Sequence, residues 1–272
     1  MPLEIVPTEW PGQSVWVGVG ILTAFVMVAL TTRGGRRLSA LSLLGVVGVA
    51  AIAGGRLLWA LASPEGPLGA GGRWWALLDP GVPGFASFGA IWGGALVGGV
   101  ALRLLPESQS LALLDRVVPA GFVGLAWARF GCLVDGCDFG ATADHRWSVV
   151  YPAGSRIWRI HQQAGLVDPT AAWSAGLHPF PIYLVGGTVA AVLAGWLLTR
   201  GRVGAPGLRA VATAGLYLVC RWSIEWFRSP MNATPVLGRW VNLNQVFSAA
   251  TFGLLVLSIG WYLGGEKRDI AI

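Results

Sequence analysis

Long apolar segments separated by short polar stretches dominate the chain. Each segment is long enough to cross the roughly 30 Å hydrocarbon core of a bilayer as a helix. The seven segments are 14–31, 39–62, 86–105, 116–134, 180–199, 210–228 and 243–264. This pattern predicts an all-α membrane protein with about seven transmembrane helices, and residues 1–272 are expected to form a single transmembrane bundle.

The composition agrees with a chain whose main solvent is lipid. Only 12% of the 272 residues are charged and 54% are hydrophobic, whereas charged residues make up about a quarter of an average soluble domain. The 40 glycines suit membrane helices, in which small residues let backbones approach closely. Glu4 and Glu9 stand where a secretory signal is basic, so the first apolar segment is expected to be retained.

Basic residues collect between alternate apolar segments and set the expected orientation. The clusters are Arg33, Arg36 and Arg37; Arg103 and Arg116; Arg200, Arg202 and Arg209; and Lys267 and Arg268. With seven spans, all four clusters fall on one side, which is therefore cytoplasmic, and the amino terminus faces outward. Residues 135–178 are long enough to form a small cap outside the membrane. Because the basic residues form no continuous stripe, we expect no nucleic acid partner.

Four charged residues lie inside the apolar segments rather than at their ends, and each costs about 2.5–3.5 kcal/mol there on insertion scales. They are Arg56, Arg129, Arg221 and Glu225. Charged groups at such positions tend to face a cavity or a partner and to mark function. These four residues are therefore the first candidates for a site.

Arg129 lies in a glycine-rich sequence at the outer end of the fourth segment, ARFGCLVDGCDFG at 128–140. Asp135, Gly136 and Gly140 indicate that the helix ends here and that the backbone turns closely around something polar. An arginine beside exposed backbone N–H groups suits a phosphate head group. The alternative is that Arg129 extends to the interface while the glycines only pack, and composition alone leaves both interpretations open.

Tyr217, Arg221 and Glu225 follow one another at intervals of four residues, so they share one face of a helix. The main alternative to a functional role is an internal ion pair between Arg221 and Glu225 that fixes helix packing. A phenol, an arginine and a carboxylate on one stripe are more typical of a cavity wall than of a surface that faces lipid.

His178 lies beside proline at the outer edge of the fifth segment, where a lone histidine is usually a capping or packing residue. Cys132 and Cys137 are five residues apart on the expected outer side, where oxidation is permitted. Two interpretations of these cysteines stay open: a disulfide between them, and two free thiols that are buried as small hydrophobic residues. No cluster of residues indicates a metal or an organic cofactor.

Seven short motifs occur along the chain in a fixed order. They are GRLLW at 55–59, SFGAIWGG at 87–94, ARFGCLVDGCDFG at 128–140, RWSVVYP at 146–152, HPFPIY at 178–183, LYLVCRWSIEWFR at 216–228 and NQVFS at 244–248. Each motif is weak alone. Together and in this order they resemble the motifs of the prolipoprotein diacylglyceryl transferase family over nearly the whole chain.

The resemblance implies a bacterial inner-membrane enzyme with seven spans, an outward amino terminus and a periplasmic head. Such an enzyme transfers diacylglyceryl from phosphatidylglycerol to the lipobox cysteine thiol of a prolipoprotein signal peptide and releases glycerol phosphate. It implies no cofactor, and its expected partners are phosphatidylglycerol, prolipoprotein signal peptides and the lipid bilayer.

The resemblance also implies roles for individual residues. It assigns Arg129, Arg221 and His178 to catalysis, with the two arginines flanking the head group and the histidine on the periplasmic side. The implied substrate-binding residues are Arg56, Asp135, Gly136, Gly140, Tyr217 and Glu225.

The chain departs from the family pattern at several positions. Phe88 stands where the family has a third-span histidine, and Pro181 and Leu184 replace a glutamine and an acidic residue around the tyrosine of HPFPIY. The first span has no counterpart of a family tyrosine near Trp16. Two alternatives follow: a transferase with another acceptor or transferred group, and a non-catalytic relative that binds phospholipid or signal peptide. How the thiol loses its proton also stays open. His178 is the best candidate for the base, and the alternative is that the arginines lower the pKa of the thiol.

Overall fold

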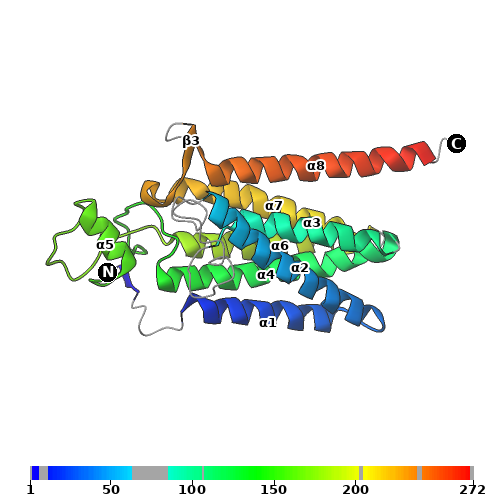
Figure 1. The fold of residues 1–272 in the computed structure, drawn as a ribbon, viewed down its shortest axis with the longest axis horizontal. Helices are drawn as coiled ribbons and strands as arrows, with labels where there is room; N and C mark the ends of the chain where they lie inside the picture. Colours follow the sequence, from blue (N-terminus) through cyan, green and yellow to red (C-terminus); the bar gives the residue numbers. More distant parts are fainter. Residues whose placement is uncertain are drawn as a thin grey trace. The chain divides into compact units, whose positions relative to one another are not determined.

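The structure is a computed structural model that describes residues 2–5, 12–62, 85–105, 107–201, 205–237 and 241–269. The described residues form eight α-helices, which Figure 1 labels. These are α1 (Gln13–Thr31), α2 (Arg36–Ala62), α3 (Ser87–Arg103), α4 (Glu107–Asp135), α5 (Arg156–Gln163), α6 (Phe180–Thr199), α7 (Leu208–Ile224) and α8 (Leu243–Asp269). Short strands and 3-10 turns complete the fold: β1 (Leu3–Glu4), β2 (Val149–Val150), β3 (Pro235–Leu237), β4 (Val241–Asn242), η3 (Glu225–Phe227) and η4 (Pro230–Asn232).

All seven expected apolar segments coincide with long helices. Within the described residues, α1, Arg36–Leu61 of α2, Gln109–Asp135 of α4 and α6 are long and apolar enough to cross a membrane. Helix α3 and residues Leu243–Ser258 are apolar but shorter. The chain is thus a largely helical protein with several candidate spans, whereas seven spans and an outward amino terminus stay predictions.

The sixth expected segment, 210–228, is shorter as a helix than its sequence suggests. Helix α7 ends at Ile224 and continues as the 3-10 turn η3, and η4 follows at Pro230. Proline disfavours a helical conformation at the residue before it, and it also lacks the backbone N–H that an α-helix needs. The end of this segment is therefore a set of tight turns, which carries Glu225 and Arg228.

The chain divides into two compact units, Phe25–Val117 and a second unit that combines Met1–Ala24 with Val118–Ile272. In the first unit, glycines bring α2 and α3 into backbone contact. A Cβ added at Gly93 would lie 2.5 Å from the carbonyl oxygen of Ala50. A Cβ at Gly54 or Gly89 would lie at least as close to a carbonyl oxygen of the facing helix. This close packing of small residues is typical of helices that associate in membranes.

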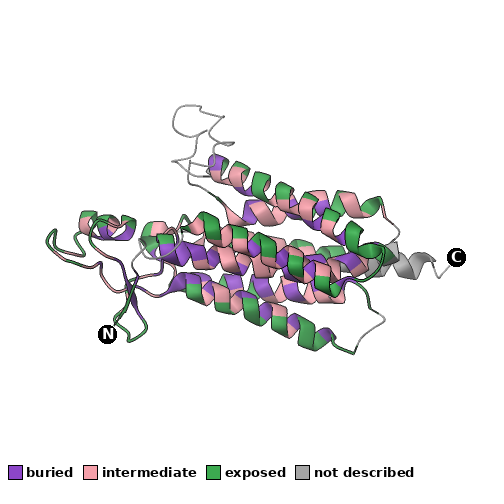
Figure 2. Ribbon diagram, turned by 90° about the horizontal axis from the view of Figure 1, so that it is seen from below, coloured by how far each residue is buried: buried purple, intermediate pink, exposed green. Residues whose placement is uncertain are grey.

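In the second unit, the beginning of α1 packs on α4, and α6 packs on α7. A Cβ at Gly20 would lie 2.5 Å from the carbonyl oxygen of Gly124, and the rings of Trp16 and Trp127 stack with centroids 5.7 Å apart. Exposed residues occur along the length of the long helices (Figure 2). Many of them are large and apolar, such as Leu22 on α1 and Leu193 on α6. Lipid contact accounts for apolar side chains on an outer face.

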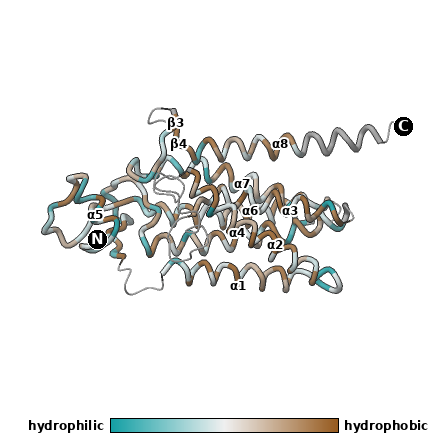
Figure 3. Tube along the Cα trace, in the orientation of Figure 1, coloured by the Kyte–Doolittle hydropathy of each residue, from teal (hydrophilic) through white to brown (hydrophobic). Residues whose placement is uncertain are grey.

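A small cap lies at the end of α4 within the second unit. Strand β1 from the beginning of the chain pairs in parallel with β2, so that Leu3 lies opposite Val149. The cap has its own core of seven buried side chains: Ile5, Leu133, Phe139, Val149, Tyr151, Ile157 and Leu177. The Tyr151 hydroxyl donates to the Leu133 carbonyl at 2.6 Å and ties the cap to α4. Hydrophilic residues concentrate around α5, whereas apolar residues dominate the long helices (Figure 3).

The cap corresponds to the expected segment 135–178. Its position outside the membrane and the single bundle expected over 1–272 stay predictions.

Candidate functional site

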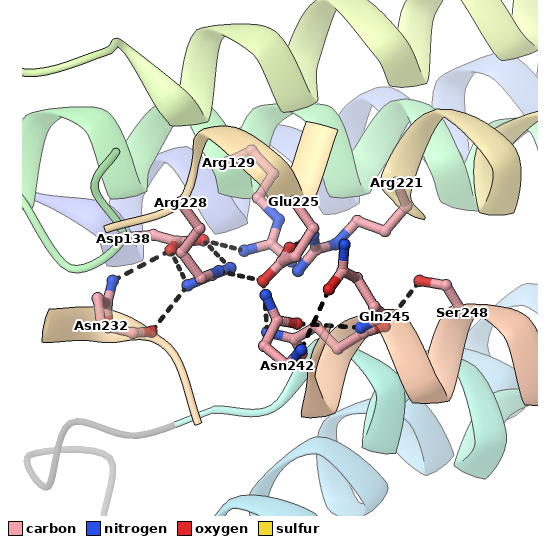
Figure 4. A network of polar contacts seen from close by, with 10 residues as sticks. Arg129, Asp138, Arg221, Glu225, Arg228, Asn232, Asn242, Gln245 and Ser248 are labelled. Atoms are coloured by element: carbon pink, nitrogen blue, oxygen red, sulfur yellow. Dashed lines mark hydrogen bonds and ion pairs between the residues drawn. The ribbon is translucent and has the colours of Figure 1, made fainter. Parts of the chain in front are cut away.

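A buried network of charged side chains lies in the second unit, between the end of α4 and the end of α7 (Figure 4). Arg129 is in the second-to-last turn of α4 and is 8% exposed. Its Nη1 lies 3.0 Å from Oδ2 of Asp138, a residue in the loop that follows the helix. The expected helix end is confirmed, because α4 stops at Asp135 and Gly136 has a left-handed φ of 63°.

The chain reverses direction at Gly136, where the surrounding atoms leave no room for a side chain. A Cβ there would lie 2.8 Å from Cδ1 of Ile157, and a positive φ is costly for residues other than glycine. The reversal carries Asp138 back toward Arg129. Gly136 therefore shapes the site through the backbone.

Arg221 and Glu225 form the internal ion pair that their spacing predicts, and both side chains are almost completely buried. Arg228 joins them from the following turn. Its Nε contacts Glu225 Oε1, and its Nη1 lies 2.5 Å from Asp138 Oδ1. The carboxylates of Asp138 and Glu225 thus link three arginines that come from α4, α7 and the turn after η3.

Amide side chains surround the two carboxylates. The Asn232 side chain donates to Asp138 Oδ1 at 3.2 Å, and the Asn244 side chain donates to Glu225 Oε1 at 3.0 Å. Asn244 belongs to the first turn of α8, so this helix begins at the network. The positive end of its dipole adds to the attraction for an anion.

The network is rich in positive charge. Among the described residues it combines three guanidinium groups with two carboxylates. Burial alone would raise the pKa of Asp138, but the charges of Arg228, Arg129 and Arg221 outweigh it, and the pKa is lowered. Because arginine stays protonated in proteins, these guanidinium groups offer fixed positive charge and N–H donors to an anionic ligand.

Gly140 holds the cap against the network. It forms a β-bridge with Arg228, and a Cβ there would lie 2.5 Å from the His178 carbonyl oxygen and 2.9 Å from that of Phe227. The next residue, Ala141, donates to the Phe227 carbonyl at 2.8 Å and accepts from the His178 N–H at 2.9 Å. Gly140 therefore lets three backbone segments meet.

His178 belongs to an aromatic cluster on the cap side of this backbone junction. Its Nδ1 lies 3.1 Å from the Tyr183 hydroxyl, which also accepts from the indole N–H of Trp147 at 3.2 Å. The rings of His145 and Phe227 lie 5.3 and 5.2 Å from its ring. Partial burial and the neighbouring His145 lower the pKa of His178, which favours the neutral imidazole.

Other residues singled out in the sequence lie around or away from the network. Tyr217 is buried one turn before Arg221, with its ring 4.5 Å from that of Phe122. Asp135 accepts from the Gln13 N–H at 2.8 Å and so caps the beginning of α1. Arg56 belongs to the other unit, where its guanidinium lies 5.8 Å from the Trp59 ring.

Cys132, Cys137 and Cys220 are free thiols. Cys132 is buried and accepts from the Gln13 side chain at 3.1 Å, which favours the buried-thiol interpretation over a disulfide. Among the described residues, no three His, Cys, Asp or Glu side chains form a group that could hold a metal ion.

The sequence interpretation did not include Asp138, Arg228 or Gln245 among the site residues. Asp138 lies three residues after Asp135 in the same glycine-rich turn, and only the path of the backbone decides which of the two faces the arginines. Arg228 was visible as a charge three residues after Glu225. Gln245 lies in the NQVFS motif, but its role depends on how α8 is capped.

Comparison with known proteins indicates the family. The sequence model of prolipoprotein diacylglyceryl transferases matches residues 3–261. Two relatives named phosphatidylglycerol–prolipoprotein diacylglyceryl transferase come from Nitratidesulfovibrio vulgaris, 29% identical over 156 residues, and Pasteurella multocida, 25% identical over 166 residues. The matched residues cover 54% and 57% of this chain, and 49% and 52% of those proteins, respectively.

A shorter match has higher identity. A protein of Clostridium perfringens named phosphatidylglycerol–prolipoprotein diacylglyceryl transferase 2 is 41% identical over 73 residues, which cover 26% of this chain and 28% of that protein. The chain therefore spans about half or less of the length of these curated relatives.

Proposed function

This chain belongs to the prolipoprotein diacylglyceryl transferase family, and we propose that it transfers diacylglyceryl from phosphatidylglycerol to the lipobox cysteine thiol of prolipoproteins. Glycerol phosphate is the second product. The observation that carries this proposal is the buried network in which Arg129, Arg221 and Arg228 meet around the carboxylates of Asp138 and Glu225.

The arginines suit the phosphate of the lipid donor. Guanidinium groups bind phosphate oxygens through paired N–H donors and keep their charge in a buried site. In the proposed complex, Arg129 and Arg221 hold the phosphate from α4 and α7. Glu225 and Asp138 orient the arginines, and Gly140 and Tyr217 shape the space around the head group.

The reaction follows from this arrangement. The cysteine thiolate attacks the glycerol carbon that carries the phosphate ester, so that a C–S bond forms as the C–O bond breaks. The bonding electrons move to the departing phosphate oxygen, and a singly charged diester becomes a doubly charged monoester. Fixed cations beside that oxygen lower the barrier because negative charge grows there in the transition state.

The thiol must lose its proton before it attacks. Phe88 has no group that could accept this proton. The lowered pKa of His178 favours its neutral form, which can accept a proton, and the backbone around Gly140 connects it to the arginine network. We assign to His178 the contact with the incoming thiol at the cap side of the site.

The proposed setting is the bacterial inner membrane. The protein crosses it seven times, with the amino terminus and the cap on the periplasmic side. Phosphatidylglycerol enters from the bilayer, and the prolipoprotein signal peptide brings its cysteine to the periplasmic end of the site. Asp135 and Gly136 support the turn at this end.

A second candidate is a non-catalytic or altered-specificity relative that binds phospholipid or signal peptide, or that transfers to another acceptor. The replacement of the family histidine by Phe88 favours it, because Phe88 is buried beside Trp92 and has no acid–base chemistry. Leu184 adds to this argument, because it is buried at a position where the family has an acidic residue.

Complementation separates the two candidates. The wild-type gene, Arg129→Ala, Arg221→Ala and the control Arg159→Ala are expressed at equal membrane abundance in a bacterium depleted of its own transferase. Arg159 is an exposed residue of α5. The proposal predicts rescue by the wild type and the control but not by the two network variants. A well-inserted wild type that fails to rescue would favour the second candidate.

A further inference from the structure

Tyr183 connects two nitrogen-bearing rings at the beginning of α6. Its hydroxyl oxygen lies 3.1 Å from Nδ1 of His178 and accepts from the indole N–H of Trp147 at 3.2 Å. An indole N–H only donates, whereas a hydroxyl oxygen has two acceptor positions and one proton of its own. Trp147 therefore occupies one acceptor position of this oxygen, and His178 contacts the same hydroxyl group.

Packing holds Tyr183 and His178 in this arrangement. Tyr183 belongs to the first turn of α6. Its ring packs edge-on against Phe227 with centroids 5.4 Å apart, and the His178 ring lies 5.2 Å from the same Phe227. Phe180, between the two residues in sequence, is buried, and its ring centroid lies 4.5 Å from the Arg228 guanidinium. The segment that carries both side chains is thereby fixed against the arginine network.

This contact decides which nitrogen of His178 can take a proton from a thiol. Nδ1 faces the Tyr183 hydroxyl, so Nε2 is the nitrogen that can face an incoming thiol. Partial burial and the neighbouring His145 lower the pKa of His178, which favours a neutral ring with a single proton. Nε2 of a neutral imidazole is a base only when that proton is on Nδ1. The tautomer of His178 therefore determines whether it can act.

The Tyr183 oxygen suits the tautomer that has its proton on Nδ1. In this tautomer Nδ1–H donates to the oxygen, which then accepts two N–H bonds, one from His178 and one from Trp147. Tyr183 is only half-buried, so water can accept its own hydroxyl proton. Once Nε2 has taken a proton, both ring nitrogens are donors, and the same oxygen still accepts from Nδ1–H. The contact thus serves both the neutral base and its protonated form.

We propose that Tyr183 is a positioning residue that accepts from Nδ1–H of His178 and so leaves Nε2 free to take the proton of the lipobox thiol. This inference rests on the proposed function and adds to it the group that orients the base, a common third partner of a nucleophile and its base. The S–H proton moves to Nε2, and its bonding electrons stay on sulfur, which attacks the glycerol carbon. The imidazolium returns the proton to water after the transfer.

Histidine-selective nitrogen NMR tests the contact without any substrate. The chain has three histidines, so nitrogen-15 labelling of histidine in the full-length protein in lipid bilayers gives few signals. The signals that disappear in His178→Gln belong to His178. At pH 8 we expect the wild type to carry the proton of His178 on Nδ1. Tyr183→Phe keeps the ring that packs on Phe227 but removes the acceptor, so the proton should move to Nε2.

Transfer kinetics test the consequence, with Tyr151→Phe as the matched control. This variant loses the same kind of hydroxyl group, one that ties the cap to α4 through the Leu133 carbonyl, while His178 keeps its Tyr183 partner. We expect Tyr183→Phe to lower kcat at least about tenfold and to leave KM for phosphatidylglycerol within about twofold, because general base catalysis acts on the chemical step. Tyr151→Phe should unfold at a lower temperature but keep the tautomer of His178 and a kcat close to the wild type.

Three results would overturn the inference while the proposed function stands. They are a wild-type His178 that carries its proton on Nε2, a Tyr183→Phe variant that keeps the wild-type tautomer, and equal losses of kcat in Tyr183→Phe and Tyr151→Phe. The last result would assign Tyr183 to attachment of the cap. A wild type that forms no thioether from phosphatidylglycerol and a lipobox peptide would overturn the proposed function and, with it, this role of Tyr183, whichever tautomer the spectra show.

Discussion

Asp138→Asn is predicted to destabilise the protein strongly, although it preserves the shape of the side chain. Asp138 is 6% exposed, and its two oxygens lie 3.0 Å from Arg129 Nη1 and 2.5 Å from Arg228 Nη1. Removing one partner of a buried ion pair costs about 3–5 kcal/mol, because the other charge is left uncompensated. Asparagine keeps one acceptor oxygen, so we expect about 3 kcal/mol, which is roughly a 150-fold change in the folding equilibrium.

The assay is unfolding of the full-length protein in micelles by titration with a denaturing detergent, followed through tryptophan fluorescence. Asp135→Asn is the matched control from the same turn. Its carboxylate accepts the Gln13 N–H at the beginning of α1 at an exposed position. Asparagine keeps an acceptor oxygen and caps helices about as well as aspartate, so the expected loss is below about 1 kcal/mol.

Lipid provides a second readout of the same variant. Asp138→Asn removes one negative charge from the network, so phosphatidylglycerol should restore more stability to it than to the wild type. The reasoning is refuted if Asp138→Asn is no more destabilising than Asp135→Asn, or if anionic lipid does not distinguish it from the wild type.

Three further predictions concern the same end of the second unit. Gly140→Ala places a Cβ 2.5 Å from the His178 carbonyl oxygen. We expect the free energy of unfolding to fall by about 1–3 kcal/mol from overpacking, and we expect weaker rescue in the complementation assay. Wild-type stability and rescue would contradict the role of Gly140 in the backbone junction. Burial lowers the pKa of His161, whose ring nitrogens meet no hydrogen-bond partner among the described residues. Its neutral form is therefore favoured in the fold, and cap stability should fall as the pH drops below about 6.5, the unfolded value; His161→Phe should remove this pH dependence in hydrogen exchange. The Asp138 carboxyl has a lowered pKa, so its stabilisation is complete above the unfolded value near 3.9 and is lost as the pH falls through the lower folded value; acid titration of Asp138→Asn should lack this step.

The helices and part of the site were accessible from the sequence, because the physics behind them is local. Apolar length alone located the seven long helices. A charge in an apolar segment is costly enough to be informative, and Arg129, Arg221 and Glu225 do meet in one network. The i, i+4 spacing of Arg221 and Glu225 also predicted their ion pair.

The remaining features of the fold and the site depend on the three-dimensional path of the backbone. Asp138 and Asp135 are equivalent by composition, and the reversal at Gly136 directs one toward the arginines and the other toward α1. The pairing of β1 with β2 joins segments far apart in sequence, and two-residue strands have no periodic signal to predict it. The reciprocal contacts by which Asn242 and Gln245 cap α8 become visible only in the structure.

One measurement tests the proposed transfer most directly. Purified wild-type protein is incubated with phosphatidylglycerol and a lipobox peptide, and the peptide mass and the released glycerol phosphate are measured beside Arg129→Ala, Arg221→Ala and Arg159→Ala. The account predicts a diacylglyceryl thioether and equimolar glycerol phosphate from the wild type and Arg159→Ala, with little of either from the two network variants. Folded wild type that binds phosphatidylglycerol but forms no thioether would contradict it.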